Sequence, residues 1–306
     1  MAWAAKVEAD MMAMKHQDTR IISNKTLGDL IARYTEEIGA VRPFGRNKAD
    51  VLGKLKASLG ETALPHLTVD VLMHYIRERR ARGAGGVTIG IDLTYLGGVL
   101  STAKNLWRLP VKTDVVSEAR ANLKYMGVST KSKERDRRPT VDELQRLKAH
   151  FAGKTRQKVP MPDLIDFAVA TAMRAGEIIR LRWADLNERD RTIIIRDRKH
   201  PTEKHGNDQE VPLLGEAFAI VKRQPRTEGE PRIFPVTDGT ISTIFPRACK
   251  ALGIEDLTFH DLRHEGVSRL FEQGYTIEQV SLVSGHRDWK MLARYTQIRA
   301  KDLHRD

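Results

Sequence analysis

FHDLRHEGVSRLFEQGYTIEQVSLVSGHRDWKMLARYTQI, residues 259–298, concentrates side chains that suit chemistry on a phosphodiester. His260 and Arg263 lie three residues apart, and Tyr295 follows His286 by nine residues. Arginine offers a permanently charged planar fork to phosphate oxygens, histidine can donate or relay a proton near neutral pH, and a tyrosine hydroxyl can act as a nucleophile. This set predicts an active site that requires no metal ion and no other cofactor.

Capping residues and glycines divide the same stretch into helices. Thr276 with Gln279 forms a capping box, and Gly274 and Gly285 suit the ends of helices. We therefore expect helices at about 260–273, 276–284 and 288–298.

Upstream, the apolar pattern changes to that of a β-hairpin. RTIIIR at 191–196 and QEVPLL at 209–214 are plausible partner strands, and the tip between them, DRKHPTEKHGND, is long and basic. Helices are expected at about 161–173 and 240–252. A capping box at Thr140 and Glu143 predicts where the second domain begins.

The hydrophobic pattern of the first half of the chain predicts helices only. Thr26 and Asp29 can cap a helix with an apolar face from Leu27 to Ile38, and three further helical patterns follow. These patterns run over about 47–59, 68–82 and 88–107, which predicts a four-helix domain. Its polar faces are basic and could follow a DNA backbone, with Arg42, Arg46 and Lys48 as the candidate contacts.

Composition agrees with a polyanionic partner. The 306 residues carry a formal charge of +12, which favours nucleic acid through counterion release. A single cysteine, Cys249, excludes an intrachain disulfide and fits a reducing compartment. Because charged residues interrupt the N-terminus and no apolar stretch is long enough to span a membrane, we expect a cytoplasmic protein with no membrane partner.

Four motifs resemble the tyrosine recombinase (phage integrase) family. HDLRH at 260–264, SGHRD at 284–288 and ARYTQI at 293–298 resemble its C-terminal signature, and TAMRAGEIIRLRWADL at 171–186 resembles its first arginine box. The resemblance implies a mainly α fold with a small antiparallel β-sheet, arranged as a two-domain DNA clamp.

The resemblance also divides the chain. It implies a tail or helix at 1–22, which resembles the remnant of an arm-binding module, and a helical core-binding domain at 23–128. A charged linker at 129–138 and a catalytic domain at 139–306 follow.

Site residues follow from the matched motifs. Arg174 and Arg263 would grip the scissile phosphate, Tyr295 would attack it, His286 would hydrogen-bond a phosphate oxygen, and His260 would assist proton movement at the tyrosine. A hairpin lysine would protonate the leaving 5′-oxygen, and the spacing to Pro212 favours Lys204, with Lys199 as the alternative. Glu177 would position an arginine or local backbone. The remaining hairpin candidates for DNA contact are Arg198, Lys199 and His205.

The implied activity is site-specific recombination of double-stranded DNA. Cleavage would form a 3′-phosphotyrosyl link, and two rounds of strand exchange through a Holliday junction would integrate, excise or invert DNA. The resemblance further implies a homotetramer on two DNA sites, with DNA-bending accessory proteins as further possible partners. The polar end of the chain, 297–306, is a candidate segment for coupling neighbouring protomers.

Three alternatives stay open on sequence alone. His260, His264 and His286 could form a metal site of a hydrolase, although this leaves Arg174 and Tyr295 unexplained. A catalytically silent DNA-binding protein would have the same basic faces. A type IB topoisomerase would share the chemistry, but the chain's size and small helical clamp fit a recombinase better.

Overall fold

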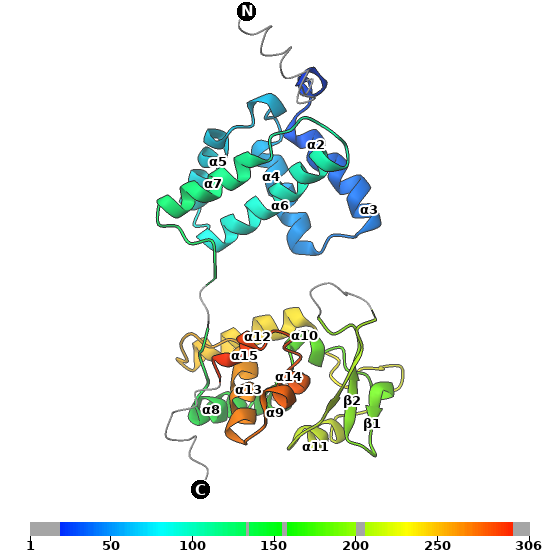
Figure 1. Cartoon of the computed structure of the whole chain (residues 1–306). Helices are drawn as coiled ribbons and strands as arrows, with labels where there is room; N and C mark the ends of the chain where they lie inside the picture. The colour runs from blue at the N-terminus through cyan, green and yellow to red at the C-terminus, as the bar shows by residue number, and fades with distance from the viewer. Residues whose placement is uncertain (1–18, 133–134, 155–157, 200–205, 296–306) are drawn as a thin grey trace, which may run out of the picture. The chain divides into compact units, whose positions relative to one another are not determined.

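The computed structural model describes residues 19–132, 135–154, 158–199 and 206–295. The chain forms two compact units, Met1–Glu134 and Arg135–Asp306, each with its own hydrophobic core (Figure 1). The division falls inside the segment 129–138 that the sequence suggested as a linker. Among the described residues, no helix is long and apolar enough to cross a membrane.

The named elements in the described part of the first unit are all helices. A π-helical turn, η2, joins α2 to α3, so that the three together form the first predicted helix. All four predicted helices are confirmed, and the capping box of Thr26 and Asp29 is present at the start of α2. The elements are η1 (Thr19–Ile22), α2 (Leu27–Arg33), η2 (Tyr34–Ile38), α3 (Gly39–Val41), α4 (Arg46–Leu59), η3 (Leu64–His66), α5 (Val69–Ala81), α6 (Gly86–Asn105) and α7 (Asp114–Tyr125).

Helix α7 was not predicted from the sequence. It buries a stripe of only four apolar residues, Val115, Val116, Ala119 and Leu123, against α5 and α6. The helix is only 12 residues long, so packing of this stripe contributes much of its stability.

The second unit surrounds two helices, α9 and α13, with further helices and a small sheet (Figure 1). The three strands form an antiparallel sheet in the order β1-β2-β3, in which Ile193 pairs with Val211. The elements are α8 (Val141–Ala152), α9 (Met161–Thr171), α10 (Ala175–Ile178), η4 (Trp183–Asp185), β1 (Leu186–Asn187), β2 (Thr192–Ile195), β3 (Gln209–Pro212), α11 (Ala217–Lys222), α12 (Asp238–Ala251), α13 (Asp261–Glu272), α14 (Ile277–Ser284) and α15 (Lys290–Ala293).

Most predicted elements of this unit are confirmed, including the capping boxes at Thr140 and Thr276. The final predicted helix is shorter than expected, because α15 ends at Ala293 and residues from 296 onward lie outside the described part. Strand β1 and helix α11 were not predicted, since each is too short to show a clear period.

Close packing of α13 on α9 sets the geometry of the unit. Gly266 lies in α13, and a Cβ there would come within 2.4 Å of the carbonyl oxygen of Val169. Beyond Val169 in the chain, Ala172 ends α9 with a left-handed φ of 51°. Met173 follows it. The chain then turns directly into Arg174, so the crossing brings the two family arginine motifs together.

The segment Arg135–Arg138 is tied to this unit by ion pairs. Arg135 binds Asp261 at 2.8 Å, and Arg138 binds Glu265 at 2.7 Å. Both carboxylates lie on α13, and both are buried. The charged run therefore attaches to the helix that carries Arg263.

Candidate active site

Arg263 and His286 lie side by side in the interior of the second unit. Arg263 Nη1 donates a hydrogen bond to the carbonyl oxygen of Ala172 at 2.6 Å, and its Nη2 lies 3.2 Å from His286 Nε2. The guanidinium is almost fully buried, with 3% of the residue exposed. Burial and the nearby Arg174 lower the pKa of Arg263 to about 9, so it remains charged at neutral pH.

The buried carboxylate of Glu177 interacts with several arginine side chains. Glu177 accepts hydrogen bonds from the backbone nitrogen of Arg174 at 3.1 Å and from its Nη1 at 2.6 Å. Glu177 Oε1 also lies 3.6 Å from Arg198 Nε. Although burial opposes ionisation, Arg198, Arg174 and Arg263 keep the pKa of Glu177 below its usual value. Three guanidinium groups therefore surround one negative charge, and the excess positive charge favours binding of an anion.

Hydrogen bonds fix the ring of His286 and its tautomer. The Ser284 hydroxyl donates to the carbonyl oxygen of Val280 at 2.6 Å and lies 2.8 Å from His286 Nδ1. Because the hydroxyl has only one proton, Nδ1 must donate to Ser284, which leaves Nε2 as an acceptor from Arg263. Burial and Arg263 lower the pKa of His286 to about 3, so the imidazole is neutral at pH 7.

Tyr295 contacts His264. The tyrosine hydroxyl is hydrogen-bonded to His264 Nδ1, and the two rings stack with centroids 5.7 Å apart. Burial raises the pKa of the Tyr295 hydroxyl. Burial and the neighbouring His260 lower the pKa of His264 to about 4, so His264 is neutral at pH 7 and can accept a proton.

The histidine that contacts the Tyr295 hydroxyl is His264, whereas we expected His260 to assist proton movement there. The His260 ring packs edge-on against His264 at 5.2 Å. Both histidines belong to HDLRH, one helical turn apart, so either could reach the same neighbour. The second histidine of that motif was the available signal, and we had considered it only as a metal ligand.

The predicted hairpin contacts divide into three groups. Lys199 is exposed, while Lys204 and His205 lie outside the described residues. Arg198 does not lie on the surface as we predicted, because only 2% of it is exposed. Its guanidinium is held by main-chain carbonyl oxygens at the end of α14, which removes it from direct contact with DNA.

In the first unit, Arg42 and Arg46 are exposed, as a DNA contact would require. Lys48 is half-buried. Its Nζ donates to the Tyr34 hydroxyl at 2.8 Å and lies 3.9 Å from the centre of the Phe44 ring. These aromatic contacts hold the ammonium group in one place.

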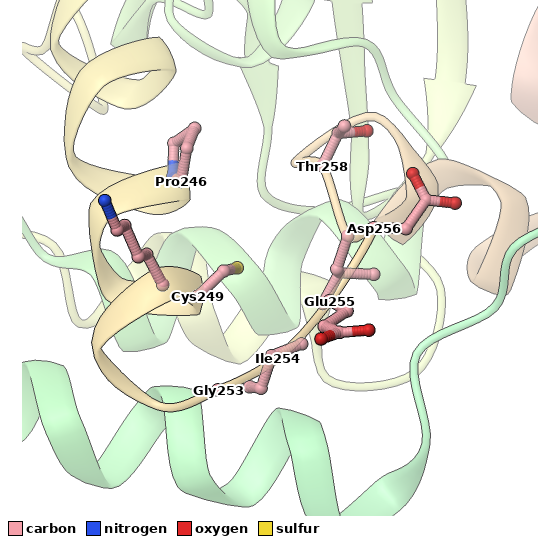
Figure 2. A pocket seen from close by; sticks show the side chains of 9 residues that line it. Pro246, Cys249, Gly253, Ile254, Glu255, Asp256 and Thr258 are labelled. Carbon is pink, nitrogen blue, oxygen red and sulfur yellow. The ribbon is translucent and has the colours of Figure 1, made fainter.

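Within the described part of the chain, no three His, Cys, Asp or Glu side chains, His260, His264 and His286 included, are placed to hold a metal ion. Figure 2 shows a hollow between α12 and the start of α13, with Cys249 in its wall. Burial raises the pKa of that thiol to about 11, which makes it unreactive at neutral pH.

The fold and the site together define a protein of the tyrosine recombinase class. Residues 137–302, more than half of the chain, match the Phage integrase family, and the chain belongs to that family.

Similar proteins agree with this assignment. The shufflon-specific DNA recombinase of Escherichia coli is 32% identical over 235 residues, a match that covers 76% of this chain and 57% of that protein's length. A lambda integrase dimer bound to a COC′ core site has a TM-score of 0.70 at 21% identity, covering 99% of this chain and 88% of that one. A lambda integrase tetramer bound to a Holliday junction has a TM-score of 0.69 at 20% identity, covering 97% and 88%.

Proposed function

We propose that this protein is a site-specific DNA recombinase that cleaves and rejoins strands through a covalent link to Tyr295. The observation that carries the proposal is the buried cluster in which Arg174, Arg198 and Arg263 share Glu177 beside His286. A cluster with surplus positive charge gains stability when a phosphate enters it.

Arg174 and Arg263 would hold the scissile phosphate. A guanidinium can donate two parallel hydrogen bonds to phosphate oxygens, and Arg263 remains charged at neutral pH despite its burial. His286 lies beside Arg263 and would hydrogen-bond a phosphate oxygen.

Tyr295 would attack the phosphorus, and its proton would pass to His260, as the matched motif implies, or to His264, which the hydroxyl contacts. The new bond joins the tyrosine oxygen to phosphorus, and the bond from phosphorus to the 5′-oxygen breaks. That oxygen takes a proton from a hairpin lysine, Lys204 or Lys199, and leaves as a 5′-hydroxyl. The phosphotyrosyl link retains the energy of the broken bond, so rejoining to another strand requires no ATP.

The proposed assembly is a homotetramer on two DNA sites that exchanges strands through a Holliday junction. The lambda integrase tetramer, whose fold this chain shares, is bound to such a junction. Residues 23–128 would grip DNA as a core-binding domain, with 129–138 as the linker and 139–306 as the catalytic domain. The protein would act in the cytoplasm, and DNA-bending proteins are possible partners.

The first test is formation of a covalent protein–DNA adduct on nicked duplexes from DNA flanking the gene, in the presence of EDTA. Wild type and Tyr275→Phe should form an adduct on a denaturing gel, and Tyr295→Phe should form none. Tyr275 is a matched control because it packs in the same small core as Tyr295. An adduct that persists with Tyr295→Phe would exclude Tyr295 as the nucleophile. Absence of any adduct, despite DNA binding, would favour a catalytically silent DNA-binding protein.

A substrate with sulfur in place of the 5′-bridging oxygen would identify the lysine. A thiolate leaves without prior protonation, so this substrate bypasses the need for a general acid. Lys199→Ala and Lys204→Ala are compared on both substrates. One variant should lose cleavage of the oxygen substrate but retain cleavage of the sulfur substrate, and the lysine replaced in that variant is the general acid. If sulfur rescues neither slowed variant, no hairpin lysine acts as the acid.

A further inference from the structure

Arg198 is a buried cation that contributes charge to the cluster but would not contact the phosphate in the proposed chemistry. It follows strand β2 at the base of the β2–β3 hairpin, immediately before Lys199. Its Nη1 donates to Gln209 Oε1 at 2.8 Å and to the carbonyl oxygen of Leu282 at 3.1 Å. Its Nη2 donates to the carbonyl oxygen of Val283 at 2.7 Å. One side chain thus joins the hairpin to the end of α14.

The attachment lies at the negatively charged end of a helix dipole. Leu282 and Val283 are in the last turn of α14, where the final carbonyl oxygens have no partner within the helix. A guanidinium there supplies hydrogen bonds and a complementary charge. Helix α14 ends at Ser284, so the position of its last turn fixes Gly285 and His286.

Other contacts tighten the same junction. Gln209 on β3 donates to the carbonyl oxygen of Leu282 at 3.3 Å, and Arg287 donates to Asn207 Oδ1 at 2.9 Å. The backbone nitrogen of Arg198 donates to the carbonyl oxygen of Asn207 at 2.8 Å, which closes the base of the hairpin. The hairpin base therefore has a defined position relative to the chain segment that includes His286.

Arg198 also fits closely against the turn and the anion cluster. A Cβ on Gly285 would lie 2.5 Å from Arg198 Cζ, so the guanidinium packs directly on the glycine. Arg198 Nε has no hydrogen-bond partner and lies 3.6 Å from Glu177 Oε1. The side chain thus contacts the carboxylate that holds Arg174 but presents no group to the surface.

We propose that Arg198 is a positioning residue for strand cleavage, which holds the lysine-bearing hairpin in register with the His286 turn. This inference rests on the proposed function. Arg198 touches none of the reacting atoms, and it acts by keeping the leaving-group acid and the phosphate site at a fixed separation. The planar fork is essential, because lysine could satisfy only part of the set formed by Gln209, Leu282 and Val283.

The experiment compares cleavage of the oxygen and 5′-sulfur substrates by wild type and Arg198→Lys. The substitution keeps the positive charge near Glu177 but loses the fork. We expect about 10²-fold slower cleavage of the oxygen substrate, as for a displacement of about 1 Å, with DNA affinity unchanged. Sulfur should restore Arg198→Lys to within about tenfold of wild type on the same substrate, because that reaction does not need a positioned acid.

Arg196→Lys is the matched control. Arg196 directly follows the same strand, two residues before Arg198, and also holds a carboxylate with its fork, at 2.6 Å from Asp185, but its side chain is 55% exposed. Cleavage by this variant should equal wild type on both substrates.

Two results would overturn the inference while the wild type still forms its adduct. Arg198→Lys could cleave the oxygen substrate at the wild-type rate, or it could lose activity equally on both substrates. If Arg198→Lys fails to fold by circular dichroism, Gln209→Leu replaces it, since this removes one hydrogen-bond partner of the fork and leaves the charge. Its slower oxygen cleavage must also be rescued by sulfur, and equal loss on both substrates would reject the inference. Absence of a wild-type adduct would instead reject the proposed function.

Discussion

At Gly285 two separate requirements fall on one residue. Its φ of 71° is in the left-handed region that glycine adopts without strain, and Arg198 occupies the space in which a side chain would start. Gly274 also ends a helix with a positive φ, of 85°, but nothing lies within 4 Å of its missing Cβ. A side chain at Gly274 would cause backbone strain alone, whereas a side chain at Gly285 would cause backbone strain and a steric clash.

We predict that Gly285→Ala destabilises the protein more than Gly274→Ala does. The Gly274 variant should lose about 1 kcal/mol for its left-handed backbone, and the Gly285 variant about 2 kcal/mol more because Arg198 must move. Urea unfolding followed by circular dichroism measures both differences. Equal losses would mean that Arg198 is free to shift.

A second residue-scale prediction concerns pH. His264 is 6% exposed, with a pKa lowered to about 4, whereas a histidine in the unfolded chain titrates near 6.5. The unfolded state therefore binds more protons between these values. The stabilisation is complete above about pH 6.5 and is lost progressively as the pH falls toward 4.

The free energy of unfolding should consequently fall between pH 7 and pH 5, by up to about 2 kcal/mol from His264 alone. His264→Asn should show a smaller fall over the same interval, whatever its stability at pH 7. Urea titrations at the two pH values test this. If the unfolding free energy of His264→Asn falls between pH 7 and pH 5 by as much as that of wild type, His264 is not held neutral in the fold.

At the scale of elements, the chain just before α8 is attached to α13 by charge. Arg135 donates two hydrogen bonds to the fully buried carboxylate of Asp261, which also accepts from the backbone nitrogen and hydroxyl of Thr258. Burial opposes ionisation of Asp261, but Arg135 and Thr258 keep its pKa below the usual value. Asp261 follows His260, so this attachment anchors the start of the helix that carries Arg263 and His264.

We predict that Arg135→Ala costs about 2 kcal/mol of unfolding free energy, because a buried carboxylate loses its charged partner but keeps the bonds from Thr258. Lys222→Ala is the comparison, since Lys222 pairs with Glu188 where both side chains are about half exposed. That variant should change stability little. Thermal unfolding of both variants measures the two changes in stability. If Arg135→Ala changes the stability as little as Lys222→Ala does, the ion pair of Arg135 and Asp261 is effectively solvated.

At the scale of the whole molecule, the two units have separate cores. Buried residues from Ile22 to Leu123 form the core of the first unit, and those from Leu144 onward form the cores of the second. Each core belongs to a segment long enough to fold as an independent domain.

Residues 135–306 expressed alone should therefore unfold cooperatively, with a midpoint close to one of the transitions of the full chain. Circular dichroism and calorimetry of the fragment and the full chain provide the test. A fragment without a cooperative transition would show that the second unit depends on the first. The full chain, with a formal charge of +12, should also bind DNA with an affinity that falls steeply as salt rises.

Local physical chemistry was enough to predict much of this protein from its sequence. The capping boxes at Thr26, Thr140 and Thr276 join residues only three apart, so their hydrogen bonds form from local geometry alone. The order of helices and strands followed from hydrophobic period, and the family motifs supplied Arg174 and Tyr295 as candidates.

Only the tertiary structure decided which charged groups meet. Arg198 is buried because it binds carbonyl oxygens 84 and 85 residues away, and Arg135 pairs with a carboxylate 126 residues away. In the same way, packing of α15 brings Tyr295 to His264 rather than to His260. Such contacts depend on how whole helices pack, and a residue's own neighbours in sequence carry no information about a partner supplied by another element.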